Sequence, residues 1–242
     1  MSQPRLILFD IDGTMISTDR KAWENPFKDA MEEALAEAGE PQSINTSMYK
    51  SGGKTDTQII YEILDGNGFP EQTIARLFPL IRKKYLELLR KTVEVNPEYV
   101  ALKPGVRELL EDLQKRPEVV LALLTGNFEE GARIKLGAHG LNSYFSFGAF
   151  GEGARVRSDL PQRALDEARK HHPHPFSKKE IVIIGDTPND VHCGRHLHVR
   201  VIGVATGPYS MDELKAEGAD FVFADLRDKA RVVEAILDPL PA

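Results

Sequence analysis

Residues 6–9 form an apolar run, Leu-Ile-Leu-Phe, that leads directly into Asp10, Asp12 and Gly13. A continuous apolar run bounded by turn-forming residues is typical of a strand buried on both faces, as in a parallel sheet. Asp10 and Asp12 are two residues apart, so in an extended backbone their side chains lie on the same side. Two converging carboxylates repel each other unless a cation, a proton or hydrogen-bond donors offset the charge. This stretch therefore predicts a buried strand that ends in a reactive loop.

Two other interpretations of the same stretch are an ordinary aspartate-glycine turn and a calcium-binding loop. The calcium loop is excluded because Met15 stands where that loop needs glycine, and Lys21 stands where it needs a bidentate glutamate. The ordinary turn remains open when this stretch is taken alone.

The composition excludes several classes of protein. The 242 residues can form a substantial core in one or two domains. The 31 Lys and Arg against 37 Asp and Glu give a net charge of -6, which argues against nonspecific nucleic-acid binding. Cys193 is the single cysteine, so an internal disulfide is excluded, and neither a signal-peptide pattern nor a membrane-span-length apolar run is present. We expect a cytoplasmic monomer or homodimer with no nucleic-acid or membrane partner.

Two patterns divide the chain. Residues 15–95 predict helices only, with apolar residues at three-four spacing near 27–38, 59–64 and 74–89, the last broken or kinked at Pro79. From Pro104 onward, apolar runs near 119–124, 181–184, 200–204 and 220–223 alternate with helical patterns, which predicts a parallel sheet with right-handed crossovers. We expect an α/β fold: a Rossmann-like sheet core with helices on both faces, residues 1–15 and 100–242, and an inserted all-helical domain, residues 16–99.

Three predicted strands end in polar residues, which are Asp10 with Asp12, Thr125, and Asp186 with Asp190. In an open parallel sheet, ligands bind beyond the carboxyl ends of the strands. We therefore expect these segments to assemble one site. Thr125 alone is equally consistent with a helix N-cap.

These motifs, in this order, resemble the phosphatase branch of the haloacid dehalogenase-like hydrolase superfamily, with similarity to phosphoglycolate phosphatases. The residues that carry the resemblance are Asp10–Thr14, Leu124–Asn127 and Gly185–Asp190. The helical insertion is similar to the first type of cap domain in that family. The resemblance implies a magnesium-dependent enzyme that hydrolyses a small phosphate monoester.

The resemblance also implies roles for the acidic residues. Asp10 is the nucleophile that forms an aspartyl-phosphate, and Asp12 is the general acid and base. The Mg²⁺ ligands are Asp10, the backbone carbonyl of Asp12 and Asp186, with Asp190 nearby or bridged by water.

Residues of the second motif, Leu124–Asn127, are expected to bind the phosphoryl group, and residues of the cap are expected to bind the rest of the substrate. Thr125 donates its hydroxyl to a phosphoryl oxygen, with the loop of Gly126 and Asn127 adding donors. In the cap, Lys54 is expected to hold an anionic substituent, with Gly53 permitting close approach. A solvent-facing lysine and a plain turn explain these two cap residues equally well.

The sequence departs from the family pattern at one point. The family usually places a lysine before the helix that precedes the last motif, and no lysine lies between Lys135 and Lys170. We expect Arg157 to replace it, because its forked donors suit phosphate, with Arg155 and Arg163 as alternatives.

Other activities remain as alternatives. Dehalogenases lack the second aspartate of the first motif, and phosphonate hydrolases usually replace it by a small residue, so Asp12 argues against both. A sugar-phosphate mutase is disfavoured because the cap contains no histidine. A catalytically silent ligand-binding protein is supported only by the missing lysine.

Two local predictions concern the backbone. Segments 14–19 and 96–103 are expected to act as cap hinges. His198 stands where the family often has glycine and is expected to tolerate a positive φ.

Overall fold

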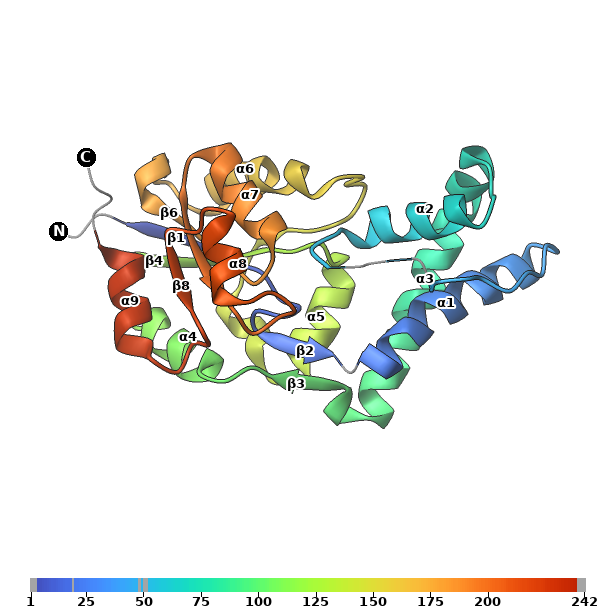
Figure 1. The fold of residues 1–242 in the computed structure, drawn as a ribbon, viewed down its shortest axis with the longest axis horizontal. Helices are drawn as coiled ribbons and strands as arrows, with labels where there is room; N and C mark the ends of the chain where they lie inside the picture. The colour runs from blue at the N-terminus through green and yellow to red at the C-terminus, as the bar shows by residue number, and fades with distance from the viewer. Residues whose placement is uncertain (1–3, 19, 48, 50–51, 239–242) are drawn as a thin grey trace.

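A parallel β-sheet forms the core of the computed structural model, which describes residues 4–18, 20–47, 49 and 52–238 (Figure 1). Six strands of the described chain pair in the order β5-β4-β1-β6-β7-β8, and every pairing is parallel. Their bounds are β1 Arg5–Phe9, β4 Val119–Leu124, β5 Gly148–Ala149, β6 Ile181–Gly185, β7 Arg200–Val204 and β8 Phe221–Phe223. β1 lies between β4 and β6, so the loop after β1 leaves from the middle of the sheet.

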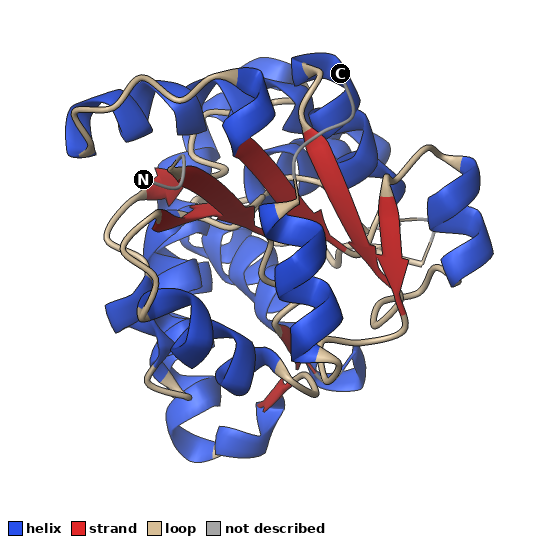
Figure 2. Cartoon of the chain, turned by 90° about the vertical axis from the view of Figure 1, so that its left-hand side faces the viewer, coloured by secondary structure: helices blue, strands red, loops and turns tan. Residues whose placement is uncertain are grey.

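Helices cover both faces of this sheet (Figure 2). Ile7 and Phe9 of β1 pack in one apolar cluster with α4 Val106–Gln114, α5 Glu129–Gly137 and α9 Lys229–Leu237. Leu6 and Leu8 point the opposite way and pack in a second cluster with α6 Leu160–His171 and α7 Pro188–Leu197. α8 Met211–Ala216 covers β7 near the sheet edge. Because both faces are covered, β1 reads as a continuous apolar run, and the predicted fold class is confirmed.

The insertion consists of three helices, α1 Arg20–Glu37, α2 Asp56–Gly66 and α3 Glu71–Val95. They lie between β2 Ile16–Thr18 and β3 Val100–Leu102, which pair antiparallel, with the short turn η1 Pro97–Tyr99 before β3. The prediction of helices only was wrong at Ile16–Thr18. The segments that enter and leave the insertion form the strands β2 and β3, which pair with each other. A break at Pro79 was also wrong, since α3 continues through it.

The strand pair β2–β3 lies within the two segments expected to act as hinges, although Asp19 falls outside the described residues. The hinge role and the boundaries at residues 15/16 and 99/100 stay predictions. Short 3₁₀ turns also occur at η2 Leu141–Tyr144, η3 Arg157–Asp159 and η4 Lys178–Glu180. His198 ends α7 with φ 57°, as the sequence predicted. In the described residues, no helix combines the length and apolarity needed to cross a bilayer.

Candidate active site

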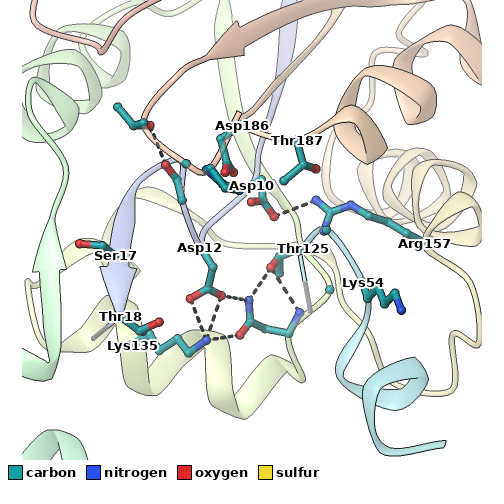
Figure 3. A pocket seen from close by; sticks show the side chains of 18 of the residues that line it. Asp10, Asp12, Ser17, Thr18, Lys54, Thr125, Lys135, Arg157, Asp186 and Thr187 are labelled. Carbon is teal, nitrogen blue, oxygen red and sulfur yellow. Dashed lines mark hydrogen bonds and ion pairs between the residues drawn. The ribbon is translucent and has the colours of Figure 1, made fainter. Parts of the chain in front are cut away.

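Three buried aspartates converge at the carboxyl end of the central strands, and Figure 3 shows two of them, Asp10 and Asp186. Asp10 follows β1, Asp186 follows β6, and Asp190 lies in the first turn of α7. Each carboxylate offers an oxygen, and these oxygens lie within 4.8 Å of one another. The sequence expectation that these segments meet is therefore matched by their positions.

Burial and mutual repulsion perturb these carboxylates. Burial raises the pKa of Asp10 to about 7, with Arg157 opposing the rise and Asp190 adding to it. Burial, followed by the charges of Asp10 and Asp190, raises the pKa of Asp186 well above its ordinary value. Carboxylate oxygens are the donors that hard divalent cations prefer, and such a cation offsets this repulsion. The donor set therefore fits a divalent metal ion.

Arg157 supplies positive charge to this cluster from η3. Its guanidinium is buried and donates to Asp10 Oδ1 at 2.8 Å and to Asp190 Oδ1. The alternatives lie elsewhere: Arg155 pairs with Glu71 on the cap, and Arg163 donates to a backbone carbonyl. Arg157 is thus the one of the three arginines that contacts the first motif.

Asp12 has a different set of partners. Lys135 of α5 donates to both of its carboxylate oxygens at 2.9 Å, and Asn127 Nδ2 donates to Oδ2 at 2.7 Å. Asn127 Nδ2 also donates to Thr125 Oγ1 at 2.7 Å, which links the second motif to the first. Thr125 is buried at the end of β4. The side chain of Asp12 is therefore held by these donors, away from the group of Asp10, Asp186 and Asp190.

Lys135 was missed from the sequence. It is 1 % exposed, and its third hydrogen bond goes to Asn127 Oδ1 at 2.7 Å. The available signal was its place in α5, where Phe128, Ala132 and Leu136 form an apolar stripe that includes position 135. A lysine in a buried stripe needs a partner, and here the partner is Asp12.

The cap contacts the second motif through backbone atoms. Asp56 N donates to Gly126 O at 2.7 Å, and a Cβ on Gly126 would lie 2.1 Å from the carbonyl oxygen of Lys54. Gly53 has φ +70°, and a Cβ there would lie 2.6 Å from Asn189 Nδ2. Both glycines therefore permit a close approach of cap and core, while the approach of Gly53 to a substrate stays a prediction.

Lys54 lies at the pocket but is already paired. Its ammonium forms an ion pair with Glu62 and sits 4.7 Å from the centroid of the Tyr49 ring. In this conformation its charge is satisfied within the cap, so contact with a substrate anion stays a prediction.

Asp56 is a second residue that sequence inspection missed. Its buried carboxylate accepts from Phe128 N at 2.8 Å, beside the start of α5. Thr57 Oγ1 and Thr55 Oγ1 donate to the carbonyls of Gly151 and Ala154. The first turn of α2 is thus docked on two loops of the core.

A cavity of about 420 Å³ connects these groups. The first motif, the loop after β4 and Arg157 line its core side, and residues 52–54 line its cap side. Lys103 and the segment 206–208 close another wall. A cavity of this size between two lobes suits a small molecule.

Comparisons with known proteins agree with this geometry. The haloacid dehalogenase-like hydrolase family matches residues 7–204, which span the first motif, the insertion and the last motif. The chain belongs to this family. The resemblance seen in the sequence is therefore confirmed, and the molecule is a haloacid dehalogenase-like hydrolase with a Rossmann-like core and a helical cap.

Individual relatives are distant in sequence, and two curated relatives match over nearly their whole length. A phosphoglycolate phosphatase from Haemophilus influenzae is 26% identical, with 93% of this chain and 96% of the relative covered. Pyrophosphatase PpaX from Oceanobacillus iheyensis is 23% identical, with 95% and 96% covered. The crystal structure of a predicted phosphoglycolate phosphatase from Haemophilus somnus matches with TM-score 0.66 and 22% identity, covering 96% of this chain and 99% of that one. This structural likeness shows the shared fold.

Proposed function

We propose that this haloacid dehalogenase-like hydrolase is a magnesium-dependent phosphatase that hydrolyses a small phosphate monoester through an aspartyl-phosphate on Asp10. The observation that carries the proposal is the placement of Asp10 in the cavity, with Asp186 and Asp190 within 4.8 Å and Arg157 at 2.8 Å. The relatives named phosphoglycolate phosphatase and pyrophosphatase support an activity at phosphorus.

The residues divide the work as follows. A carboxylate oxygen of Asp10 bonds to phosphorus while the bond from phosphorus to the leaving oxygen breaks, and Asp12 gives that oxygen its proton. Water then attacks phosphorus, Asp12 takes a proton from it, and the bond to Asp10 breaks. Arg157 offsets the charge of Asp10 and of the phosphoryl oxygens, and Thr125 holds one of those oxygens.

Magnesium would be held by Asp10, the backbone carbonyl of Asp12 and Asp186, with Asp190 beside them. When bound, it offsets the negative charge of the phosphoryl group and of these carboxylates.

The cavity limits the substrate. Its volume of about 420 Å³ lies beneath the docked first turn of α2, which favours a metabolite-sized ester over a phosphorylated protein surface. The partner we propose is therefore a small-molecule phosphate ester.

The test is release of inorganic phosphate from an aryl phosphate in the presence of magnesium or of a chelator. Activity that requires magnesium and is abolished in Asp10→Asn supports the proposal. A folded wild-type protein that releases no phosphate from a broad panel of phosphate esters and pyrophosphate would contradict it. Pyrophosphate turnover without ester turnover would move the assignment to the reaction named for the PpaX relative.

Two alternatives are weaker. A sugar-phosphate mutase has no support from the cap, because residues 16–99 contain no histidine to assist transfer. The silent ligand-binding protein was supported by the missing lysine, and Arg157 provides a cation beside Asp10 instead.

A further inference from the structure

Lys135 forms a fully satisfied cationic centre beneath Asp12. Its ammonium has three hydrogens, and three acceptors surround it: both carboxylate oxygens of Asp12 at 2.9 Å and Asn127 Oδ1 at 2.7 Å. This leaves the ammonium no donor for a ligand. Lys135 therefore acts through Asp12 rather than on a substrate.

Only one partner of the ion pair between Lys135 and Asp12 is fully buried. The side chain of Lys135 is 1 % exposed, whereas that of Asp12 is 34 % exposed at the cavity. A lysine at such a depth is costly unless its charge is paired, so the fold retains it together with the partner that it orients. The carboxylate consequently keeps one open side at the cavity.

The two carboxylate oxygens of Asp12 differ in how many hydrogen bonds they already accept. Oδ2 accepts from Lys135 and Asn127, while Oδ1 accepts from Lys135 in the described structure. Each carboxylate oxygen has two lone pairs, so Oδ1 keeps one for a proton. This arrangement fixes both the position and the free lone pair of the carboxylate.

We propose that Lys135, together with Asn127, is a positioning residue that aims Asp12 Oδ1 at the water in the second half of the reaction. The proposal rests on the phosphatase function proposed above. In this step the water oxygen bonds to phosphorus, the bond from phosphorus to Asp10 breaks, and the water proton moves to Asp12 Oδ1. That proton is then available to the next leaving group, so the cycle is balanced.

The test uses full-length protein with magnesium and 2,4-dinitrophenyl phosphate, an ester whose leaving group departs without a proton. Formation of the aspartyl-phosphate is then independent of Asp12, whereas its hydrolysis is not. Lys135→Met is expected to lower kcat by about 10- to 100-fold and to lower KM by a similar factor, leaving kcat/KM nearly unchanged. A burst of dinitrophenolate, about one per active enzyme, is expected before the slow steady state.

This pattern separates positioning from general damage. Neither KM nor the rate constant of the burst depends on the fraction of protein that is folded. Partial unfolding therefore lowers only the apparent kcat, which is calculated per total enzyme. Lys135→Gln, which keeps a polar side chain, serves if Lys135→Met does not fold and is expected to show the same split. Lys115→Met, an exposed lysine at the end of α4, is the matched control and should behave as wild type.

An unchanged kcat, or a lower kcat with unchanged KM and no burst, would overturn the role of Lys135 while leaving the phosphatase function intact. If the wild-type protein were as inactive as Asp10→Asn towards every phosphate ester, the proposed function would be overturned, and this inference with it.

Discussion

Replacing Asp56 by asparagine isolates the effect of one buried carboxylate at the contact between cap and core. Asp56 begins α2, is 4 % exposed, and accepts a hydrogen bond from Phe128 N at 2.8 Å. Burial raises its pKa from 3.8 to about 7, against the opposing charge of Lys135 and the hydrogen bond from Phe128. The docked turn of α2 therefore holds a carboxyl group that is only about half ionised at pH 7 and whose charged form folding disfavours.

The sign and size of the effect follow from proton linkage. Because the folded pKa of Asp56 is raised, the folded state favours the protonated form, so its stability contribution is complete below about pH 4. This contribution is lost as pH rises through about 7. A shift of about three pKa units corresponds to about 4 kcal/mol, of which about 3 kcal/mol develops between about pH 5 and pH 8. The asparagine side chain of the variant would keep an oxygen acceptor for Phe128 without this pH-dependent loss.

The assay is urea unfolding of the wild-type protein, Asp56→Asn and Asp65→Asn, each measured at about pH 5 and at about pH 8 with a chelator present. Asp65 is an exposed carboxylate on the same helix, so its variant controls for a general change in charge. We expect the free energy of unfolding of Asp56→Asn, minus that of wild type, to be about 3 kcal/mol larger at about pH 8 than at about pH 5. Equal differences at the two pH values would refute the reasoning.

Three other substitutions test separate features. Gly126→Ala places a methyl group 2.1 Å from the backbone oxygen of Lys54, so kcat/KM for an aryl phosphate should fall at least about 10-fold; full activity would contradict this role for the contact. His198→Gly relieves a φ of 57° and should raise the free energy of unfolding by up to about 1 kcal/mol, whereas His198→Ala should give no gain in the same urea titration. Arg157→Met should lower kcat/KM by at least about 100-fold, and Arg157→Lys should retain more activity because it keeps a cation near Asp10; equal activities would show that the charge is dispensable.

The parts of the fold set by local patterns were predictable. The apolar runs of β1, β6 and β7 were found near their true bounds, because strands covered on both faces have no polar side. Ile16–Thr18 was not, because a three-residue strand has too short a pattern and exists only through its pairing with Val100–Leu102. Pro79 was expected to break or kink a helix, yet α3 continues through it, with apolar residues such as Leu77 and Ile81 buried on either side.

The site was predictable to the extent that its residues belong to contiguous motifs. Asp10, Asp186 and Asp190 follow strand ends, so the topology of a parallel sheet was enough to bring them together. Lys135 lies in the last turn of a helix, outside any motif, and its role depends on which side chain of another segment packs against it. Asp56 resembled an ordinary helix-start residue, and only the docking of α2 on the core gives it a partner at Phe128.

The two aspartates of the first motif illustrate why spacing alone is an incomplete guide. Asp10 and Asp12 are two residues apart, yet each has its own cation from a distant segment: Arg157 is 147 positions from Asp10, and Lys135 is 123 positions from Asp12. Arg157 binds Asp10 within the buried carboxylate group, whereas Lys135 holds Asp12 at the open side of the cavity. In the proposed function Asp10 is the nucleophile and Asp12 the general acid and base, and these roles need different surroundings, because one must bond to phosphorus while the other must exchange protons. The fold meets both needs by bringing separate cations to neighbouring residues of one strand end.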